Sequence, residues 1–194
     1  AEKGEIYLTD MVEIASSSGG KIADLVLDDP TEAMGINTRV DFAAALSVLR
    51  QRTNEHWMLE GVTLVDPAST YIGPAVSLGQ DTVVLPNTHL RGATKIGEGC
   101  EIGPNTVIEA STIGDRCRVT ASVIEQSEME HDTDIGPFSH LRPGSRVCTG
   151  AHIGNFAEMK KSTLGADSHM GHFSYLGDTV TGEHVTIGAG TITC

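Results

Sequence analysis

From about residue 76 onward, the chain repeats a large apolar residue at steps of six positions, occasionally five. Four places after each of these residues comes a small or β-branched residue nearly every time, and Glu128 is the clear exception. The apolar series runs Leu78, Val84, Leu90, Ile96, Ile102, Ile108, Ile113, Val119, Ile124, Met129, Ile135, Leu141, Val147, Ile153, Met159, Leu164, Met170, Leu176, Thr181 and Ile187. The small series runs Thr82, Thr88, Thr94, Cys100, Thr106, Thr112, Ser139, Ser145, Ala151, Ala157, Thr163, Ser168 and Ser174. Six-residue repeats predict a parallel β-helix, in which each short strand lies against the strand one coil away.

The repeat also predicts how the interior is filled. One large aliphatic side chain per hexad fills the narrow core, and the small residue lets the backbone turn. Three hexads make a coil of about 18 residues, which gives a triangular prism. Cysteines of the small series, such as Cys100, are then expected to be packed thiols. The repeat alone does not set the hand of the helix.

Residues 1–60 show a different pattern, which predicts mixed α/β structure. A helix is expected with Thr9 as its cap and Gly19–Gly20 as its stop. Residues 21–29 are predicted to form a short buried strand, and residues 36–61 a long helix with apolar side chains at i, i+4 and i+7. One strand between two helices is too little sheet for a domain, so we expect the end of a larger one.

Charge and composition exclude several classes of protein. Acidic residues number 26 and basic residues 13, and the formal net charge of −13 argues against a nucleic acid or an anionic membrane as partner. No apolar run is long enough to span a membrane, and the first residues lack the apolar core of a signal peptide. The 4 cysteines show no CxxC spacing, so we expect reduced thiols in a cytoplasmic protein.

The repeat predicts which outward side chains become neighbours. Strands of adjacent coils lie about 4.8 Å apart, so equal places in every third hexad form columns. Arg142 and Lys160 each follow the apolar residue of hexads one coil apart. Two stacked cations are unfavourable unless an anion joins them, and phosphate is the favoured small anion. The alternative is a surface pair whose charge is neutralised by Glu158.

Two further columns bring titratable groups to the same edge of the prism. They are expected to hold His140, Glu158 and Tyr175 in one case, and Asn155, His172 and Ala189 in the other. With the two cations, His172 and Tyr175 make a phosphate clamp beside a titratable base. The unperturbed pKa of histidine, about 6.5, suits the removal of a proton near neutral pH.

His152 and His169 are also predicted to stack, because they hold the same place in hexads one coil apart. This raises the alternative of a metal site, since some hexapeptide-repeat proteins similar to γ-carbonic anhydrase bind zinc through three histidines. His172 falls on a different face, so the three would not converge within one chain. The other interpretation is that they are surface histidines.

Four longer motifs are more specific than the six-residue repeat. They are L-R-P-G, G-N-F-A-E-M-K-K, G-H-F-S-Y-L-G-D and I-G-A-G-T-I-T-C, all within residues 141–194. In these motifs the chain resembles the bacterial bifunctional enzymes that make UDP-N-acetylglucosamine, in which a glucosamine-1-phosphate N-acetyltransferase is joined to an N-acetylglucosamine-1-phosphate uridyltransferase. The segments Y-L-T-D and G-I-N-T-R-V resemble the end of the uridyltransferase domain of the same enzymes.

The resemblance implies a domain organisation. Residues 76–194 would form a left-handed parallel β-helix, and residues 1–60 the C-terminal α/β part of a Rossmann-like nucleotidyltransferase domain with its linker helix, joined by residues 61–75. It also implies a cytoplasmic homotrimer. The Gly-rich nucleotide loop of the uridyltransferase does not occur in the sequence, and the family continues with further coils after the position of Cys194. We therefore expect an internal segment of a longer protein.

The resemblance also implies a role for each matching residue. His172 matches the general base of acetyl transfer. Arg142 and Lys160 match residues that bind the sugar phosphate, and Tyr175 matches a residue that contacts the sugar. Ala189 matches a residue that contacts acetyl-CoA. The implied substrates are acetyl-CoA and glucosamine 1-phosphate, with UTP and N-acetylglucosamine 1-phosphate for the uridyl transfer of the complete protein.

Two matching positions have features of their own. Thr186 stands where the family usually has a substrate-binding asparagine, and a hydroxyl keeps one hydrogen bond but not the pair that an amide makes. Asn37 matches the asparagine that helps to hold Mg²⁺ in the uridyltransferase site. Asn37 equally suits the N-cap of a helix beginning at Thr38, so both interpretations stay open.

Three rival functions share the predicted fold. A zinc hydratase similar to γ-carbonic anhydrase would hold stoichiometric metal. A sugar-nucleotide transferase with a purely structural β-helix would not need the cluster of Arg142, Lys160, His172 and Tyr175. A structural β-helix alone would show flat rows of threonine, whereas charged residues interrupt the faces here.

Overall fold

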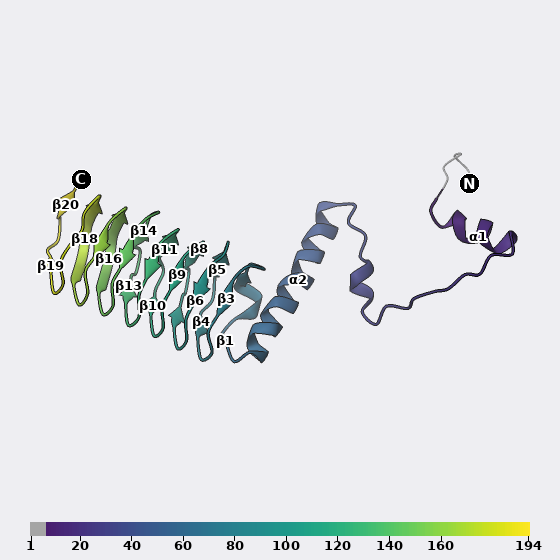
Figure 1. The fold of residues 1–194 in the computed structure, drawn as a ribbon, viewed down its shortest axis with the longest axis horizontal. Helices are drawn as coiled ribbons and strands as arrows, with labels where there is room; N and C mark the ends of the chain where they lie inside the picture. Colours follow the sequence, from purple (N-terminus) through teal and green to yellow (C-terminus); the bar gives the residue numbers. More distant parts are fainter. Residues whose placement is uncertain (1–6) are drawn as a thin grey trace. The chain divides into compact units, whose positions relative to one another are not determined.

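The computed structural model describes residues 7–194. It divides into two compact units, residues 1–45 and residues 46–194. In the larger unit, short strands follow one another in coils that stack from β1 to β20 (Figure 1). Neighbouring coils pair in parallel, as Val119 does with Ile102 on one side and Ile135 on the other. The parallel β-helix predicted from the six-residue repeat is therefore confirmed.

The strands lie in three rows. The first row contains β1 (Thr63–Leu64), β4 (Val83–Val84), β7 (Glu101–Ile102), β10 (Arg118–Val119), β13 (Asp134–Ile135) and β19 (Thr186–Ile187). The second contains β2 (Thr70–Ile72), β5 (Thr88–Arg91), β8 (Val107–Glu109), β11 (Val123–Glu125), β14 (His140–Leu141) and β20 (Ile192–Thr193). The third contains β3 (Ser77–Leu78), β6 (Lys95–Ile96), β9 (Thr112–Ile113), β12 (Glu128–Met129), β15 (Arg146–Val147) and β17 (Thr163–Leu164). Two longer strands, β16 (His152–Lys160) and β18 (His169–Gly177), pass through both the first and the second row.

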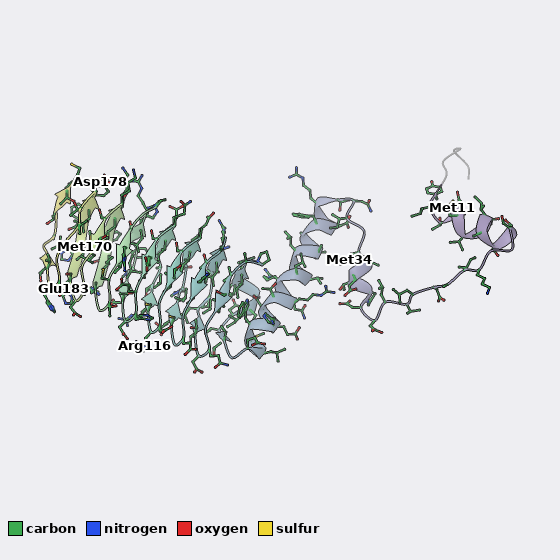
Figure 2. All side chains as sticks on the ribbon, in the orientation of Figure 1. Met11, Met34, Arg116, Met170, Asp178 and Glu183 are labelled. Carbon is green, nitrogen blue, oxygen red and sulfur yellow. The ribbon has the colours of Figure 1, made fainter. Side chains whose placement is uncertain are left out.

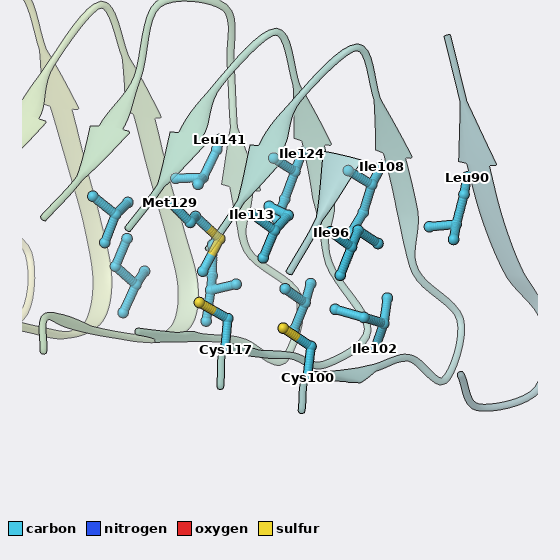
Figure 3. Packing of buried hydrophobic residues seen from close by; sticks show 14 of the residues in the cluster. Leu90, Ile96, Cys100, Ile102, Ile108, Ile113, Cys117, Ile124, Met129 and Leu141 are labelled. Carbon is cyan, nitrogen blue, oxygen red and sulfur yellow. The ribbon is translucent and has the colours of Figure 1, made fainter. Parts of the chain in front are cut away.

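The predicted apolar series fills the interior. Every member except Thr181 is buried, and Ile102 and Ile108 have no exposed surface. Each fully buried side chain of this size contributes roughly 1.5–3 kcal/mol relative to an exposed one. Cys100 and Cys117 point into the same space and are each 1% exposed (Figure 3). The expectation of packed thiols in the small series is confirmed for Cys100.

The position of each inward small residue is fixed relative to the apolar residue that follows it, not relative to the apolar residue before it. Side chains two places apart on a strand share a face, so a small residue two places before an apolar one points inward with it. Where the step is five, the predicted member was therefore wrong: Thr112 is exposed and Thr163 is half-buried. Ser111 is buried in its place, and Ser127 is buried where Glu128 was expected to interrupt the series.

The inward hydroxyl groups also satisfy backbone donors at the turns. The Oγ1 atom of Thr82 accepts a hydrogen bond from the backbone N–H of Cys100, one coil on, at 3.1 Å. Ser139 Oγ accepts in the same way from the N–H of Ala157 at 3.0 Å. Both N–H groups belong to buried residues, so the hydroxyl removes the cost of leaving them unpaired.

The helix α2 (Arg39–Leu59) confirms the long helix predicted for residues 36–61. Its second half lies in the larger unit and packs on the first coil beside the 3-10 turn η2 (Pro67–Ser69). Asn54 is 1% exposed there, and its Nδ2 donates to the carbonyl oxygens of Pro67 at 2.8 Å and Thr70 at 3.1 Å. Trp57 packs against the edge of the core.

The smaller unit has less sheet than predicted. The helix α1 (Asp10–Ser17) lies where a helix was expected, but the Thr9 side chain makes no capping hydrogen bond. The predicted strand at residues 21–29 was wrong: residues 21–27 have no regular structure, and Leu25 and Val26 are 86% and 81% exposed. A 3-10 turn, η1 (Pro30–Ala33), follows. Because a strand needs a neighbour for its backbone groups, this isolated segment has nothing to pair with among the described residues.

None of the helices within residues 7–194 combines the length and the apolar character required to cross a bilayer.

The burial of the thiols predicts the order in which they react. Cys194 is exposed and Cys148 half-buried, whereas Cys100 and Cys117 lie in the core. Contact with Cys117 and burial raise the pKa of Cys100 above its usual value, and burial raises the pKa of Cys148. We expect iodoacetamide to label Cys194 first and the core pair only after denaturation, as read by mass spectrometry. Labelling of Cys100 in the native protein at the rate of Cys194 would contradict the interior placement.

The ion pair between Glu130 and Arg146 predicts a loss of stability in acid. Arg146 Nε donates to Glu130 Oε1 at 3.0 Å, and this contact holds the pKa of Glu130 below its usual value. A lowered folded pKa contributes stability above the unfolded pKa, and that contribution is lost as the pH falls through the folded value. We expect Glu130→Gln to reduce the drop in melting temperature below about pH 4.5. Glu183→Gln is the control, since Glu183 is exposed and forms no ion pair within residues 7–194. An unchanged acid profile in Glu130→Gln would show that the pair does not stabilise the fold.

Candidate functional site

The predicted cation column is present, with Arg142 directly after β14 and Lys160 at the end of β16. Leu141 pairs with Met159, and the backbone N–H of Arg142 donates to the carbonyl of Met159 at 2.8 Å, which places Arg142 beside Lys160. Arg142 Nη1 lies 3.0 Å from Glu158 Oε1, with about two fifths of each side chain exposed. Lys160 is half-buried and forms no ion pair with any described residue. The neutralisation by Glu158 offered as the alternative therefore applies to Arg142, whereas Glu158 forms no ion pair with Lys160.

The Tyr175 column is also as predicted. His140 pairs with Glu158 across β14 and β16, and Glu158 pairs with Tyr175 across β16 and β18. The His140 ring is held by Glu125, whose Oε2 lies 2.8 Å from Nε2. The next place along β18 that faces outward is Gly177, and it pairs with Lys160. Tyr175 therefore stands in the neighbouring coil, two places before the row of the cations.

His172 lies on β18 at the bend between the first and the second row. It pairs with Asn155 of β16, as predicted, and its side chain is exposed. Its imidazole forms no hydrogen bond or ion pair with another described residue. The backbone N–H of Gly190 donates to the carbonyl of Phe173 at 2.7 Å, which brings the turn that contains Ala189 alongside, one coil on. A free imidazole at the surface can accept a proton from a bound substrate.

An aromatic corner that the sequence analysis missed adjoins His172. Phe138, Phe156 and Phe173 occupy successive left-handed turns, with φ of 60°, 55° and 50°, and they are 62%, 59% and 71% exposed. The rings of Phe138 and Phe156 stack with their centroids 5.5 Å apart. The same corner carries Asn105 in an earlier coil, a residue that tolerates this backbone conformation better. The change of residue type was visible in the sequence, but the repeat analysis followed the inward positions.

The histidine column is present but does not make a metal centre by itself. His152 pairs with His169, and their ring centroids lie 5.9 Å apart. His152 Nδ1 is 2.7 Å from Asp134 Oδ2, so a carboxylate fixes this ring. Thr186 pairs with His169 and continues the column on β19. Among residues 7–194, no group of three His, Cys, Asp or Glu side chains is arranged to hold a metal ion.

The structure excludes one of the two interpretations of Asn37 at the start of α2. The N-cap is Thr38, not Asn37: Thr38 Oγ1 accepts from the backbone N–H of Asp41 at 3.1 Å, and Asp41 Oδ2 accepts from the N–H of Thr38 at 2.8 Å. The hydrogen bond from the Thr38 hydroxyl lowers the pKa of Asp41. Asn37 contributes only its backbone N–H, at 3.1 Å from Asp41 Oδ2. The capping interpretation of the Asn37 side chain was therefore wrong.

Comparison with known proteins adds three findings. A family model described as "Bacterial transferase hexapeptide (six repeats)" matches residues 75–110. The chain is 45% identical over 191 residues to "Bifunctional protein GlmU" of Halalkalibacterium halodurans, which covers 98% of this chain and 42% of that protein. It is 47% identical over 192 residues to the protein of the same name from Synechococcus sp., with 99% and 42% covered. The chain thus spans about two fifths of the length of the curated relatives it matches.

A solved structure supports the fold independently. The UDP-N-acetylglucosamine acyltransferase of Campylobacter jejuni superposes with a TM-score of 0.51 over 66% of each chain, at 11% sequence identity. At that identity the likeness concerns the fold alone, and it agrees with the stacked coils of residues 46–194.

Proposed function

We propose that the β-helix takes part in acetyl transfer from acetyl-CoA to the amine of glucosamine 1-phosphate. The similarity of the chain to the bifunctional GlmU proteins supports this reaction. One observation carries the proposal: Arg142 and Lys160 lie side by side in neighbouring coils, and among the described residues only Arg142 has a carboxylate partner, Glu158. A dianionic phosphate supplies the missing negative charge and accepts hydrogen bonds from both cations. His172, which is exposed and has no side-chain partner among the described residues, lies on the adjoining coil.

The proposed reaction needs one proton transfer before the bond changes. The amine of the sugar is largely protonated near neutral pH, and His172 takes a proton from it. The free nitrogen then attacks the thioester carbonyl of acetyl-CoA, the C–N bond forms and the C–S bond breaks. Coenzyme A leaves as a thiol with one proton, and a second proton passes to solvent. The protein thus binds, orients and deprotonates, which is enough for direct transfer without an acyl-enzyme.

The remaining substrate contacts are proposed from the matching positions. Tyr175 and Thr186 contact the sugar, and Ala189, in the turn beside Phe173, contacts acetyl-CoA. The left-handed sense of the β-helix and a homotrimer belong to the same proposal. The domain division is proposed likewise, with residues 76–194 as the acetyltransferase β-helix, residues 61–75 as connection and residues 1–60 as the end of a Rossmann-like nucleotidyltransferase domain.

The uridyl transfer from UTP to N-acetylglucosamine 1-phosphate is proposed for the complete protein. Asn37 is the residue of this chain that would help to hold its Mg²⁺. The amide oxygen is a hard ligand of the kind Mg²⁺ prefers, and the Asn37 side chain is exposed and free of the helix cap. When bound, the ion would neutralise charge on the phosphates of the nucleotide.

Substitutions in the full-length protein separate the base from the clamp. Because His172 acts as the amine loses its proton, His172→Ala should lower kcat by about 10²–10⁴-fold and leave KM for the sugar nearly unchanged. Lys160 binds a phosphate that does not react, so Lys160→Ala should mainly raise KM for glucosamine 1-phosphate. Steady-state kinetics with release of the coenzyme A thiol measures both. Raising the pH should partly restore His172→Ala but not Lys160→Ala.

The controls are a histidine and a lysine elsewhere on the chain. His56→Ala on α2 and Lys95→Ala on β6 change exposed residues outside the cluster and should leave both constants unchanged. Near-normal turnover of His172→Ala across the pH range would remove the base and leave a purely structural β-helix. Stoichiometric zinc in the purified protein, lost together with activity on chelation, would favour the hydratase instead.

Residues 1–194 alone should release no pyrophosphate from UTP and N-acetylglucosamine 1-phosphate. The sequence contains no Gly-rich nucleotide loop, and the described part of residues 1–45 contains no strand on which such a site is built. A coupled pyrophosphate assay measures this directly, with the full-length protein as the positive control. Robust release by residues 1–194 would show that the N-terminal region has been misassigned.

A further inference from the structure

Gly177 is a glycine that the backbone does not require. It is the last residue of β18 and is buried, and its φ lies outside the left-handed range that favours glycine. Within residues 7–194, nine other glycines do have positive φ, among them Gly190 in the same region. A residue with a side chain would therefore be compatible with the backbone at position 177. The absence of a side chain must be explained by what occupies the space above it.

The space above Gly177 is filled by the ring of Tyr175. A Cβ atom at position 177 would lie 2.7 Å from Tyr175 Cε1 and 3.0 Å from its hydroxyl oxygen. It would also lie 3.1 Å from the backbone oxygen of Thr193 in the next coil. Contacts below 3.0 Å do not occur between real Cβ atoms and neighbouring carbons, so the phenol ring would have to move. The tyrosine thus lies along its own strand, over the glycine, with its hydroxyl end at position 177.

This placement brings the hydroxyl into the row of the cations. Gly177 pairs with Lys160 across β18 and β16, and Lys160 in turn lies beside Arg142. Figure 2 shows Asp178, the next residue, at one edge of the stack of coils. A tyrosine that stood upright from the strand would leave its hydroxyl two residues, or about 6–7 Å, short of this row. The glycine therefore determines where the phenol O–H can donate.

We infer that Gly177 is a positioning residue, which lets Tyr175 deliver its hydroxyl to the phosphate-bearing end of the substrate beside Arg142 and Lys160. The inference rests on the proposed function for the identity of that substrate. It adds a third donor, neutral and rigid, to the two cations that hold the anion.

A double-substitution cycle in the full-length protein tests the inference. Tyr175→Phe removes the hydroxyl, and Gly177→Ala displaces it, so each should raise KM for glucosamine 1-phosphate about tenfold or more, with KM for acetyl-CoA unchanged. The double variant should be no worse than Tyr175→Phe alone, because the hydroxyl can be lost only once. Gly182→Ala is the matched control, since a Cβ at Gly182 meets no atom within 4 Å.

The outcomes separate this inference from the proposed function. If the effects of Tyr175→Phe and Gly177→Ala add, or if either leaves KM unchanged, Gly177 does not act through the tyrosine hydroxyl and the inference fails. If Lys160→Ala also leaves KM for the sugar phosphate unchanged, the proposed function fails with it. A raised KM in Lys160→Ala together with additive effects at positions 175 and 177 overturns the inference alone.

Protein stability gives a second readout if Gly177→Ala folds poorly. In a Tyr175→Ala background the ring is gone, so the added methyl group should lower the melting temperature much less than in the native background. The same loss in both backgrounds, or failure to fold in both, would assign the glycine to the Thr193 carbonyl and overturn the inference.

Discussion

The larger unit depends on backbone hydrogen bonds that run from each coil to the next. Leu85 N–H donates to the carbonyl of Ile102 at 2.8 Å, and Gly103 N–H donates to the carbonyl of Val119, one coil further, at the same distance. Because these bonds fix the spacing of the coils, every residue acquires neighbours at the same place of the adjacent coils. The interior is therefore a set of columns of large and small side chains, and any residue that breaks a column meets two neighbours at once.

The same constraint makes the outer surface useful for chemistry. Outward residues are held on rigid strands in fixed rows, so charged groups can be stacked at a distance that they would avoid on a flexible loop. Lys160 is kept beside Arg142 by the register of β14 and β16, not by attraction between the two. The repulsion is offset in part by Glu158, and the remaining positive charge is what makes an anion the expected ligand.

Much of this arrangement could be predicted from the sequence, because the inward period and the coil length are both visible in it. The columns of Arg142 with Lys160, Glu158 with Tyr175, and Asn155 with His172 follow from counting alone. The errors have physical causes. The small residue was predicted four places after each apolar residue. This prediction failed at five-residue steps, because the small residue that points inward lies two places before the next apolar residue.

Other features depend on contacts that counting cannot show. The choice of Thr38 as N-cap depends on the reciprocal bond with Asp41. The predicted strand at residues 21–29 had the right composition but no neighbour with which to pair. The role of Gly177 depends on the direction in which the Tyr175 ring leans, and nothing in the repeat specifies this direction.

The row of Arg142 and Lys160 is proposed to recognise the phosphate of an amino sugar that is then acetylated. The most direct measurement compares acetyl transfer by the full-length protein to glucosamine 1-phosphate and to glucosamine, followed by release of the coenzyme A thiol. Two charge-assisted hydrogen bonds to the phosphate predict a kcat/KM at least about 100-fold higher for the phosphorylated sugar. Equal kcat/KM for the two sugars, or no thiol release with either, would contradict the account.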